Sequence, residues 1–211
     1  MGYIISSASK MTRRLIKQYT KKYYTKRYSE KFIGKGYSLI ASNCIGGIIN
    51  NRVGQPQNSP TVNLWIPQAE FIRFVLNLHY YMEQELVFIE SEYKYPVALL
   101  DDVHINFTHY ATKEQAKEDW ERRKKRIIWD NIYIIMYEDE VTREELLLLK
   151  DVECKKLIVL TCLKDNLDLP FMKYIEKDKH GRENDYVFLD SDFFGRMTFE
   201  KQWDYVAWLN D

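Results

Sequence analysis

The pattern of apolar and polar positions is clearest in the second half of the chain. Residues 131–136 form an apolar run, residues 142–150 have helical spacing after a Thr-Arg-Glu-Glu start, and residues 156–161 form a second apolar run. A helix between two short buried strands predicts a βαβ unit with parallel strands and a right-handed connection. We therefore expect an α/β fold: a mixed, partly parallel sheet with flanking helices, Rossmann-like in its C-terminal half.

The rest of the chain predicts further strands and helices. Pro67 opens a helix whose apolar residues form one stripe, and Thr112, with Gln115 at the capping-box position, begins a helix that runs to Lys125. Two more helices are predicted at residues 46–52 and 199–209. Strands are predicted at residues 37–40, 62–66, 95–100, 101–110 and 186–189.

The N-terminal segment is basic and amphipathic. From Lys10 to Lys31 the charges are all cationic except Glu30, and tyrosines recur among them at helical spacing. We expect residues 1–33 to form a basic amphipathic helical segment and residues 34–211 to form a single α/β domain. The helix either lies on an anionic membrane surface, where each cation contributes about 1 kcal/mol, or packs its tyrosines on the domain.

Composition and charge exclude several classes of protein. The 211 residues are 45% hydrophobic and 29% charged, which is typical of a globular domain, and 31 basic residues balance 31 acidic ones. Because the charges balance, the protein has no net positive electrostatic field that would attract nucleic acid. Three cysteines without a Cys-x-x-Cys pair predict neither a disulfide framework nor a zinc site, and they favour a reducing cytoplasm. We find no secretory signal and no apolar window of about 20 residues that could span a bilayer.

Cys44 is the first candidate for chemistry. It lies in a Ser-Asn-Cys-x-Gly-Gly turn, preceded by Asn43, between a predicted strand and a predicted helix. The positive end of a helix dipole lowers the pKa of a thiol and suits an oxyanion site, so Cys44 is a candidate acyl-accepting nucleophile. The alternative is a small buried apolar residue beside a tight turn.

A base for Cys44 is available in residues 101–110. In an extended strand, Asp102, His104, Asn106 and Thr108 share one face, whereas His109 lies on the opposite, apolar face. We expect His104 to act as the base and Asp102 or Asn106 to orient it. His109 is more typical of a hydrogen-bonded core histidine, and His104 could also be an ordinary half-exposed strand histidine. No metal site is predicted, because the adjacent carboxylates Asp101 and Asp102 would point to opposite faces.

A block of cations at residues 122–126 ends one predicted helix. It could hold the phosphates of a donor, or it could be an exposed helix end that complements the helix dipole. Phosphate-binding and hydrolase signatures such as a P-loop, GxGxxG, GxSxG and HExxH are absent from the sequence.

Several separated motifs occur together in an order that resembles one bacterial family. They are Ser42-Asn43-Cys44-x-Gly46-Gly47, Asn58-Ser59-Pro60-Thr61, Tyr95-Pro96-Val97, the stretch from Leu100 to Tyr110, and the stretch from Trp120 to Asn131. The family is the domain of unknown function 1919, whose genes are often labelled exopolysaccharide or capsule biosynthesis proteins. The resemblance implies a cytoplasmic role in assembling a surface glycan, possibly at the inner face of the membrane.

We therefore expect a transferase that modifies a surface polysaccharide or its lipid-linked precursor, with acyl transfer through Cys44 and His104 favoured and no cofactor required. Two alternatives stay open: a glycosyl- or phosphoglycosyltransferase that binds a nucleotide-sugar diphosphate, and a non-catalytic partner of a glycan-assembly complex at the membrane surface. From these motifs we expect the following residues to contact the substrate: Asn43, Asn58, Ser59, Thr61, His109, Trp120, Arg122, Arg123 and Arg126.

Overall fold

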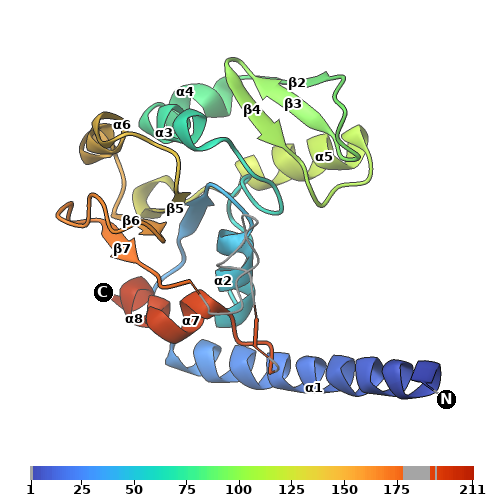
Figure 1. The fold of residues 1–211 in the computed structure, drawn as a ribbon. Helices are drawn as coiled ribbons and strands as arrows, with labels where there is room; N and C mark the ends of the chain where they lie inside the picture. The colour runs from blue at the N-terminus through green and yellow to red at the C-terminus, as the bar shows by residue number, and fades with distance from the viewer. Residues whose placement is uncertain (1, 178–190, 193) are drawn as a thin grey trace. The chain divides into compact units, whose positions relative to one another are not determined.

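The computed structural model describes residues 2–177, 191–192 and 194–211 (Figure 1). The strand predicted at residues 186–189 lies outside the described residues. The chain divides into two compact units, one of residues 36–48 and 56–174 and a smaller one of residues 1–35, 49–55 and 175–211. Each unit has its own packing, and the candidate site lies within the larger one.

The larger unit contains two sheets. The first is parallel, with its strands in the order β1 (Ser38–Ala41), β5 (Ile132–Glu138), β6 (Lys156–Thr161) and β7 (Met172–Tyr174). The second is antiparallel, in the order β2 (Leu86–Ile89), β3 (Val97–Leu100) and β4 (Val103–Asn106). The predicted mixed α/β fold is confirmed. The βαβ unit is confirmed too, because β5 and β6 pair in parallel and a helix connects them in the chain.

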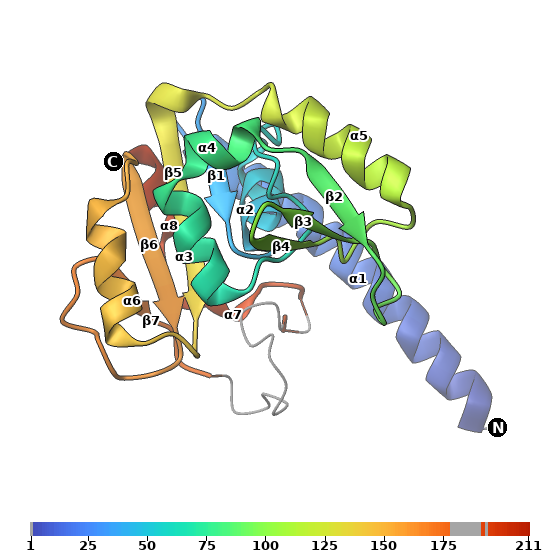
Figure 2. The same cartoon turned by 90° about the horizontal axis from the view of Figure 1, so that it is seen from above.

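Helices cover these sheets. Those that lie wholly in the larger unit are α3 (Gln68–Leu76), α4 (Leu78–Glu83), α5 (Lys113–Lys124) and α6 (Arg143–Leu148), with short 3₁₀ turns at Trp129–Asn131 and Leu149–Asp151. α3 contacts both β4 and β5 (Figure 2). Its buried phenylalanines, Phe71 and Phe74, belong to one core together with residues of both sheets. The predicted start of α5 is confirmed, because the Thr112 side chain accepts the N–H of Gln115.

The smaller unit is helical in its described part. It holds α1 (Gly2–Lys31), α7 (Thr198–Gln202), α8 (Tyr205–Asn210) and the end of α2 (Ile45–Val53), whose first residues belong to the larger unit. A buried ion pair joins Arg52 Nε to Glu200 Oε1 at 2.8 Å. The basic N-terminal helix is confirmed, and no helix of the described residues is apolar enough over a sufficient length to cross a membrane.

Two predicted strands are shorter than expected. Residues 62–66 contribute one isolated bridge, from Trp65 to Asn106, instead of a strand. The strand predicted over residues 101–110 begins only at Val103, after a turn in which Asp101 has a φ of 58°, and it ends at Asn106. Beyond it the chain turns, since the N–H of Tyr110 donates to the carbonyl of Phe107. This early turn takes His109 off the apolar face.

Close packing requires a glycine where α2 begins. A Cβ built on Gly46 would lie 2.7 Å from the Cβ of Ala41, the last residue of β1. Both atoms are attached directly to backbone, so neither can rotate away. The first turn of α2, and with it Cys44, is therefore held against the end of β1.

We expect Gly46→Ala to destabilise the larger unit by up to about 2 kcal/mol, because overpacking costs about 1–3 kcal/mol and the gain in helix propensity offsets about 1 kcal/mol of it. Gly36→Ala is the matched control, since the nearest atom to its added Cβ, Ile128 Cδ1, lies at 3.4 Å. The measurement is the midpoint of urea unfolding. Equal midpoints for the two variants would contradict the close contact.

Candidate functional site

Cys44 and a histidine meet at the start of α2, and the histidine is His109. The Nε2 atom of His109 lies 3.1 Å from Sγ of Cys44, within hydrogen-bonding distance. His109 is exposed and Cys44 is partly exposed, so the sulfur is not sealed in the core. The structure therefore brings together the predicted thiol and an imidazole, but His104, the histidine expected there, lies beside another partner.

The backbone around Cys44 is shaped as a helix start. Oδ1 of Asn43 accepts the N–H of Ile45 at 3.0 Å, and the carbonyl of Cys44 accepts the N–H of Ile48 at 3.2 Å. The first N–H groups of a helix have no acceptor inside the helix and favour negative charge. Asn43 thus serves the backbone of the turn, and the thiol lies at the electropositive end of α2.

Burial nevertheless raises the pKa of the Cys44 thiol above its ordinary value of 9.0. A hydrogen bond from the Thr108 hydroxyl to the sulfur acts in the opposite direction but does not reverse the shift. The pKa is thus raised rather than lowered as expected, because desolvation outweighs the hydrogen bonds that favour the thiolate. At neutral pH the sulfur is therefore a thiol, within hydrogen-bonding distance of the His109 imidazole.

The loop over residues 62–66 supplies the other wall of the site. Trp65 and Asn106 exchange two backbone hydrogen bonds of 3.0 Å, which join this loop to the end of β4. The preceding carbonyl, that of Leu64, lies 4.0 Å from Sγ of Cys44. Because His109 follows Asn106 by three residues, the same bridge sets the position of the imidazole.

Ser59 and Thr61, two predicted substrate contacts, are buried and hold this loop. Oγ1 of Thr61 accepts the N–H of Ala41 at 2.9 Å and lies 2.9 Å from Oγ of Ser59. Both hydroxyls are therefore used inside the fold. Asn58, also predicted to contact the substrate, is only partly buried, and its N–H donates to the carbonyl of Pro56.

The predicted contacts on α5 divide into two groups. Trp120 is 1% exposed and lies in the core, and Arg123 is buried, where it donates to Asp119, to the Tyr110 hydroxyl and to the carbonyl of Val62. Arg122 is exposed and ion-paired with Asp119, and Arg126 is exposed. Burial acts to raise the pKa of Asp119, but the two arginines outweigh it and lower that pKa below its ordinary value. Much of the cationic block thus stabilises the fold.

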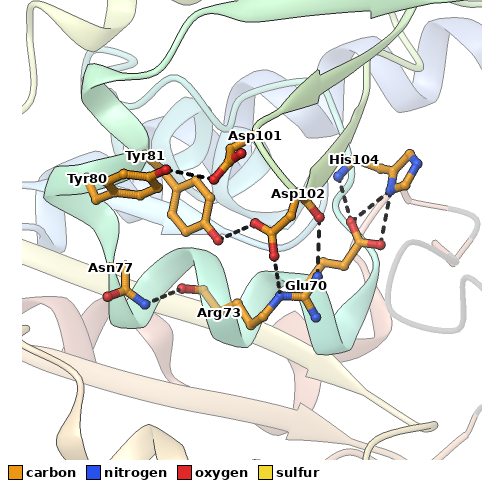
Figure 3. Close-up of polar contacts among 8 residues, drawn as sticks. All are labelled: Glu70, Arg73, Asn77, Tyr80, Tyr81, Asp101, Asp102 and His104. Atoms are coloured by element: carbon orange, nitrogen blue, oxygen red, sulfur yellow. Dashed lines mark hydrogen bonds and ion pairs between the residues drawn. The ribbon is translucent and has the colours of Figure 1, made fainter.

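His104 pairs with Glu70 on α3 (Figure 3). Nδ1 of His104 lies 3.1 Å from Oε1 of Glu70, and the backbone N–H of His104 donates to Oε2 at 2.6 Å. The imidazole side chain is 45% exposed. Glu70, a residue that sequence reasoning did not select, thus takes the orienting position that Asp102 or Asn106 was expected to hold.

Asp102 anchors the β3–β4 turn instead (Figure 3). Its carboxylate accepts the Tyr81 hydroxyl at 2.6 Å and Nε of Arg73 at 3.1 Å. The Tyr81 hydrogen bond, together with the Arg73 charge, lowers the pKa of Asp102, while burial and this same bond raise the pKa of Tyr81 to about 12. In the described residues neither Asp102 nor Asn106 hydrogen-bonds to a histidine ring.

The chemistry that this arrangement supports is that of a cysteine–histidine dyad. Over the described ranges, no carboxylate or amide binds the second ring nitrogen of His109, and no cluster of three or more His, Cys, Asp or Glu side chains could hold a metal ion. The sequence pattern gave Thr108 no role and placed His109 on the apolar face, because the turn after Asn106 contains no glycine or proline to mark it.

Two comparisons with known proteins match most of the chain. The family model described as "Domain of unknown function (DUF1919)" matches residues 15–210. A protein of Haemophilus influenzae described as "Uncharacterized protein" is 33% identical over 184 residues, which cover 85% of this chain and 87% of that protein. Both extend across the candidate site.

We expect His109→Ala to slow alkylation of Cys44 by iodoacetamide about 100-fold at pH 7, the usual scale of general-base assistance. Because the thiol pKa is raised, the wild-type rate should keep rising past pH 9, and the two rates should converge there as thiolate forms without a base. Rates are measured by mass spectrometry in a background with Cys154 and Cys162 replaced by serine. His104→Ala is the control, and a His109→Ala rate that matches it at pH 7 would disprove the dyad.

Proposed function

The chain belongs to the DUF1919 family, whose description assigns no activity, and from the site itself we propose a transferase that moves an acyl group through Cys44. The observation that carries this proposal is the 3.1 Å contact between Sγ of Cys44 and Nε2 of His109. The proposed acceptor is a hydroxyl of a surface polysaccharide or of its lipid-linked precursor. A cytoplasmic location agrees with three cysteines that form no disulfide bond, all of them among the described residues.

The proposed reaction has two steps. His109 Nε2 accepts the thiol proton as sulfur attacks the carbonyl carbon of an acyl donor, and the leaving group departs with that proton, so that a thioester remains on Cys44. In the second step His109 takes the proton of the acceptor hydroxyl as its oxygen attacks the thioester carbonyl. The carbon–sulfur bond breaks, and the proton returns to sulfur.

The surroundings of Cys44 support this sequence of steps. The first N–H groups of α2 have no acceptor inside the helix, and they favour the negative charge that develops on the carbonyl oxygen. The Thr108 hydroxyl favours the thiolate, while burial keeps the resting thiol protonated. Such a thiol reacts when the imidazole removes its proton, which couples nucleophilic attack to the presence of His109.

A nucleotide-sugar transferase is the weaker alternative. It needs free cations for a diphosphate, but Arg123 is buried and paired, and Arg122 is paired with Asp119. Arg122, Lys125 and Arg126 are the exposed cations of the block, and of these Arg122 is ion-paired. The thiol–imidazole contact has no role in that reaction, so acyl transfer accounts for more of the geometry.

We expect incubation with acetyl coenzyme A or p-nitrophenyl acetate to add one acetyl group to Cys44, detected by intact-mass spectrometry and removed by neutral hydroxylamine. Cys44→Ser should abolish this hydroxylamine-sensitive adduct, and His109→Gln should slow its formation about 100-fold. His104→Gln is the matched control and should acylate like the wild type. An equal adduct on Cys154, or no adduct on Cys44 from either donor, would contradict the proposal.

A second proposed role, attachment to an anionic membrane surface, rests on α1. Leu15, Tyr19 and Tyr23 are 57%, 77% and 54% exposed, and they lie on the same helix as the exposed cations Lys21, Lys22, Lys26, Arg27 and Lys31. Exposed rings and aliphatic groups among cations suit the boundary between lipid head groups and acyl chains. This attachment would bring the enzyme close to a lipid-linked acceptor.

We expect the full chain to sediment with vesicles of 30% phosphatidylglycerol in phosphatidylcholine, and much less with phosphatidylcholine alone. Replacing Lys21, Lys22 and Lys26 with glutamine should weaken binding about 100-fold, since each cation contributes about 1 kcal/mol. The matched control replaces three exposed lysines of the other unit, Lys113, Lys117 and Lys125. Equal losses in both triple variants would argue against α1 as the membrane contact.

A further inference from the structure

A second pocket lies in the larger unit, at the amino-terminal edge of the parallel sheet. Its volume is about 590 Å³, within the range of about 300–1,000 Å³ that is usual for small-molecule sites. The junction of α3 and α4 forms one wall, and the 3₁₀ turn before β5 and residues 153–155 before β6 form the others. The lining residues used below are His79, Tyr80, Trp129, Asp130, Glu153 and Lys155.

The aromatic walls are held in place before any ligand enters. The rings of His79 and Trp129 are stacked, with centroids 3.9 Å apart and an interplanar angle of 16°. The Tyr80 hydroxyl donates to Asp101 at 2.7 Å (Figure 3), the residue with the positive φ in the β3–β4 turn. Side chains that are already ordered lose little entropy on binding.

These aromatic rings also remain accessible. Trp129 is 39% exposed and Tyr80 is 48% exposed, whereas Trp120 is 1% exposed. The asparagine that follows Trp129 and Asp130 donates from Nδ2 to the carbonyl of Gly36 at 2.7 Å, so this turn is anchored while its indole faces the pocket. Exposed rings on fixed backbone are a feature of binding surfaces.

The charges in the pocket indicate the class of ligand. Asp130 and Glu153 outnumber the single lysine, Lys155, so the pocket does not attract a phosphate. Carboxylates accept hydrogen bonds from hydroxyl groups, and the electron-rich faces of aromatic rings attract the weakly positive C–H groups of a sugar face. We propose that this pocket binds a pyranose sugar, which presents both kinds of group.

The sugar pocket is separate from the thiol site. It includes Ile132, the first residue of β5, whereas Cys44 follows the carboxyl end of β1, which runs parallel to β5. The two sites therefore lie at opposite edges of one sheet. Sugar binding here goes beyond the proposed acyl transfer and does not depend on it.

The test is direct binding to the full chain of methyl glycosides of glucose, galactose, mannose and N-acetylglucosamine, measured by saturation-transfer and ¹H–¹⁵N NMR. At least one glycoside should bind and shift the indole N–H of Trp129. Trp129→Ala should weaken binding about tenfold or more, and Asp130→Asn with Glu153→Gln should also weaken it. Tyr93→Ala removes an exposed ring outside this pocket and is the matched control.

Each competing result has a distinct reading. Cys44→Ala should bind the glycoside as the wild type does, even if no acyl transfer is ever found. The proposal is overturned if none of the four glycosides binds at 50 mM, if Trp129→Ala and Tyr93→Ala bind alike, or if adenosine or choline binds in their place. Folding of each variant is checked by the dispersion of the same NMR spectra.

Discussion

The candidate site depends on the paired backbone hydrogen bonds between Trp65 and Asn106. This bridge connects a loop without regular structure to the last residue of β4, and both walls around Cys44 extend from it. Leu64 precedes one partner and His109 follows the other. Without the bridge, the thiol would still lie at the start of α2, but neither the carbonyl nor the imidazole would have a fixed position beside it.

Buried polar groups maintain this bridge. Thr61 ties the loop to the end of β1, while Tyr110 and Arg123 both donate to the carbonyl of Val62. A buried network of this kind stabilises only when its members are satisfied, because each unpaired group costs its full desolvation energy. Thr61 and Arg123, which the sequence predicted as substrate contacts, therefore hydrogen-bond within the fold and support the site.

Much of the fold could be predicted from local pattern. The β5–α6–β6 unit has apolar strands and a Thr142–Glu145 capping box, so each local signal agrees with the tertiary structure. The position of Cys44 between a strand and a helix followed from the same kind of signal. The predicted C-terminal helix is instead two helices, and α8 starts where Asp204 accepts the N–H of Ala207.

The pairing of side chains could not be predicted in the same way. The alternating pattern of residues 101–110 is correct up to Asn106, but where the strand ends is decided by Trp65, some 40 residues away in the chain. Likewise Glu70 has no local mark that connects it to His104. The pKa of Cys44 depends on how far burial outweighs the hydrogen bonds to its sulfur, and both follow from the three-dimensional packing.

The parallel direction of β1 and β5 limits which molecules could occupy both edges of the sheet together. Ile132 lies at the sugar pocket, and Tyr137 lies near the thiol, because its N–H donates to the hydroxyl of Ser42. The strand rises five residue steps from Ile132 to Tyr137, so at about 3.3 Å per residue the two sites are roughly 17 Å apart. A monosaccharide is too short to reach from one edge to the other. An extended oligomer of several sugar units could bind in the aromatic pocket with one sugar and present a distant hydroxyl to the sulfur of Cys44. The length of the glycan chain would then decide which molecules are substrates.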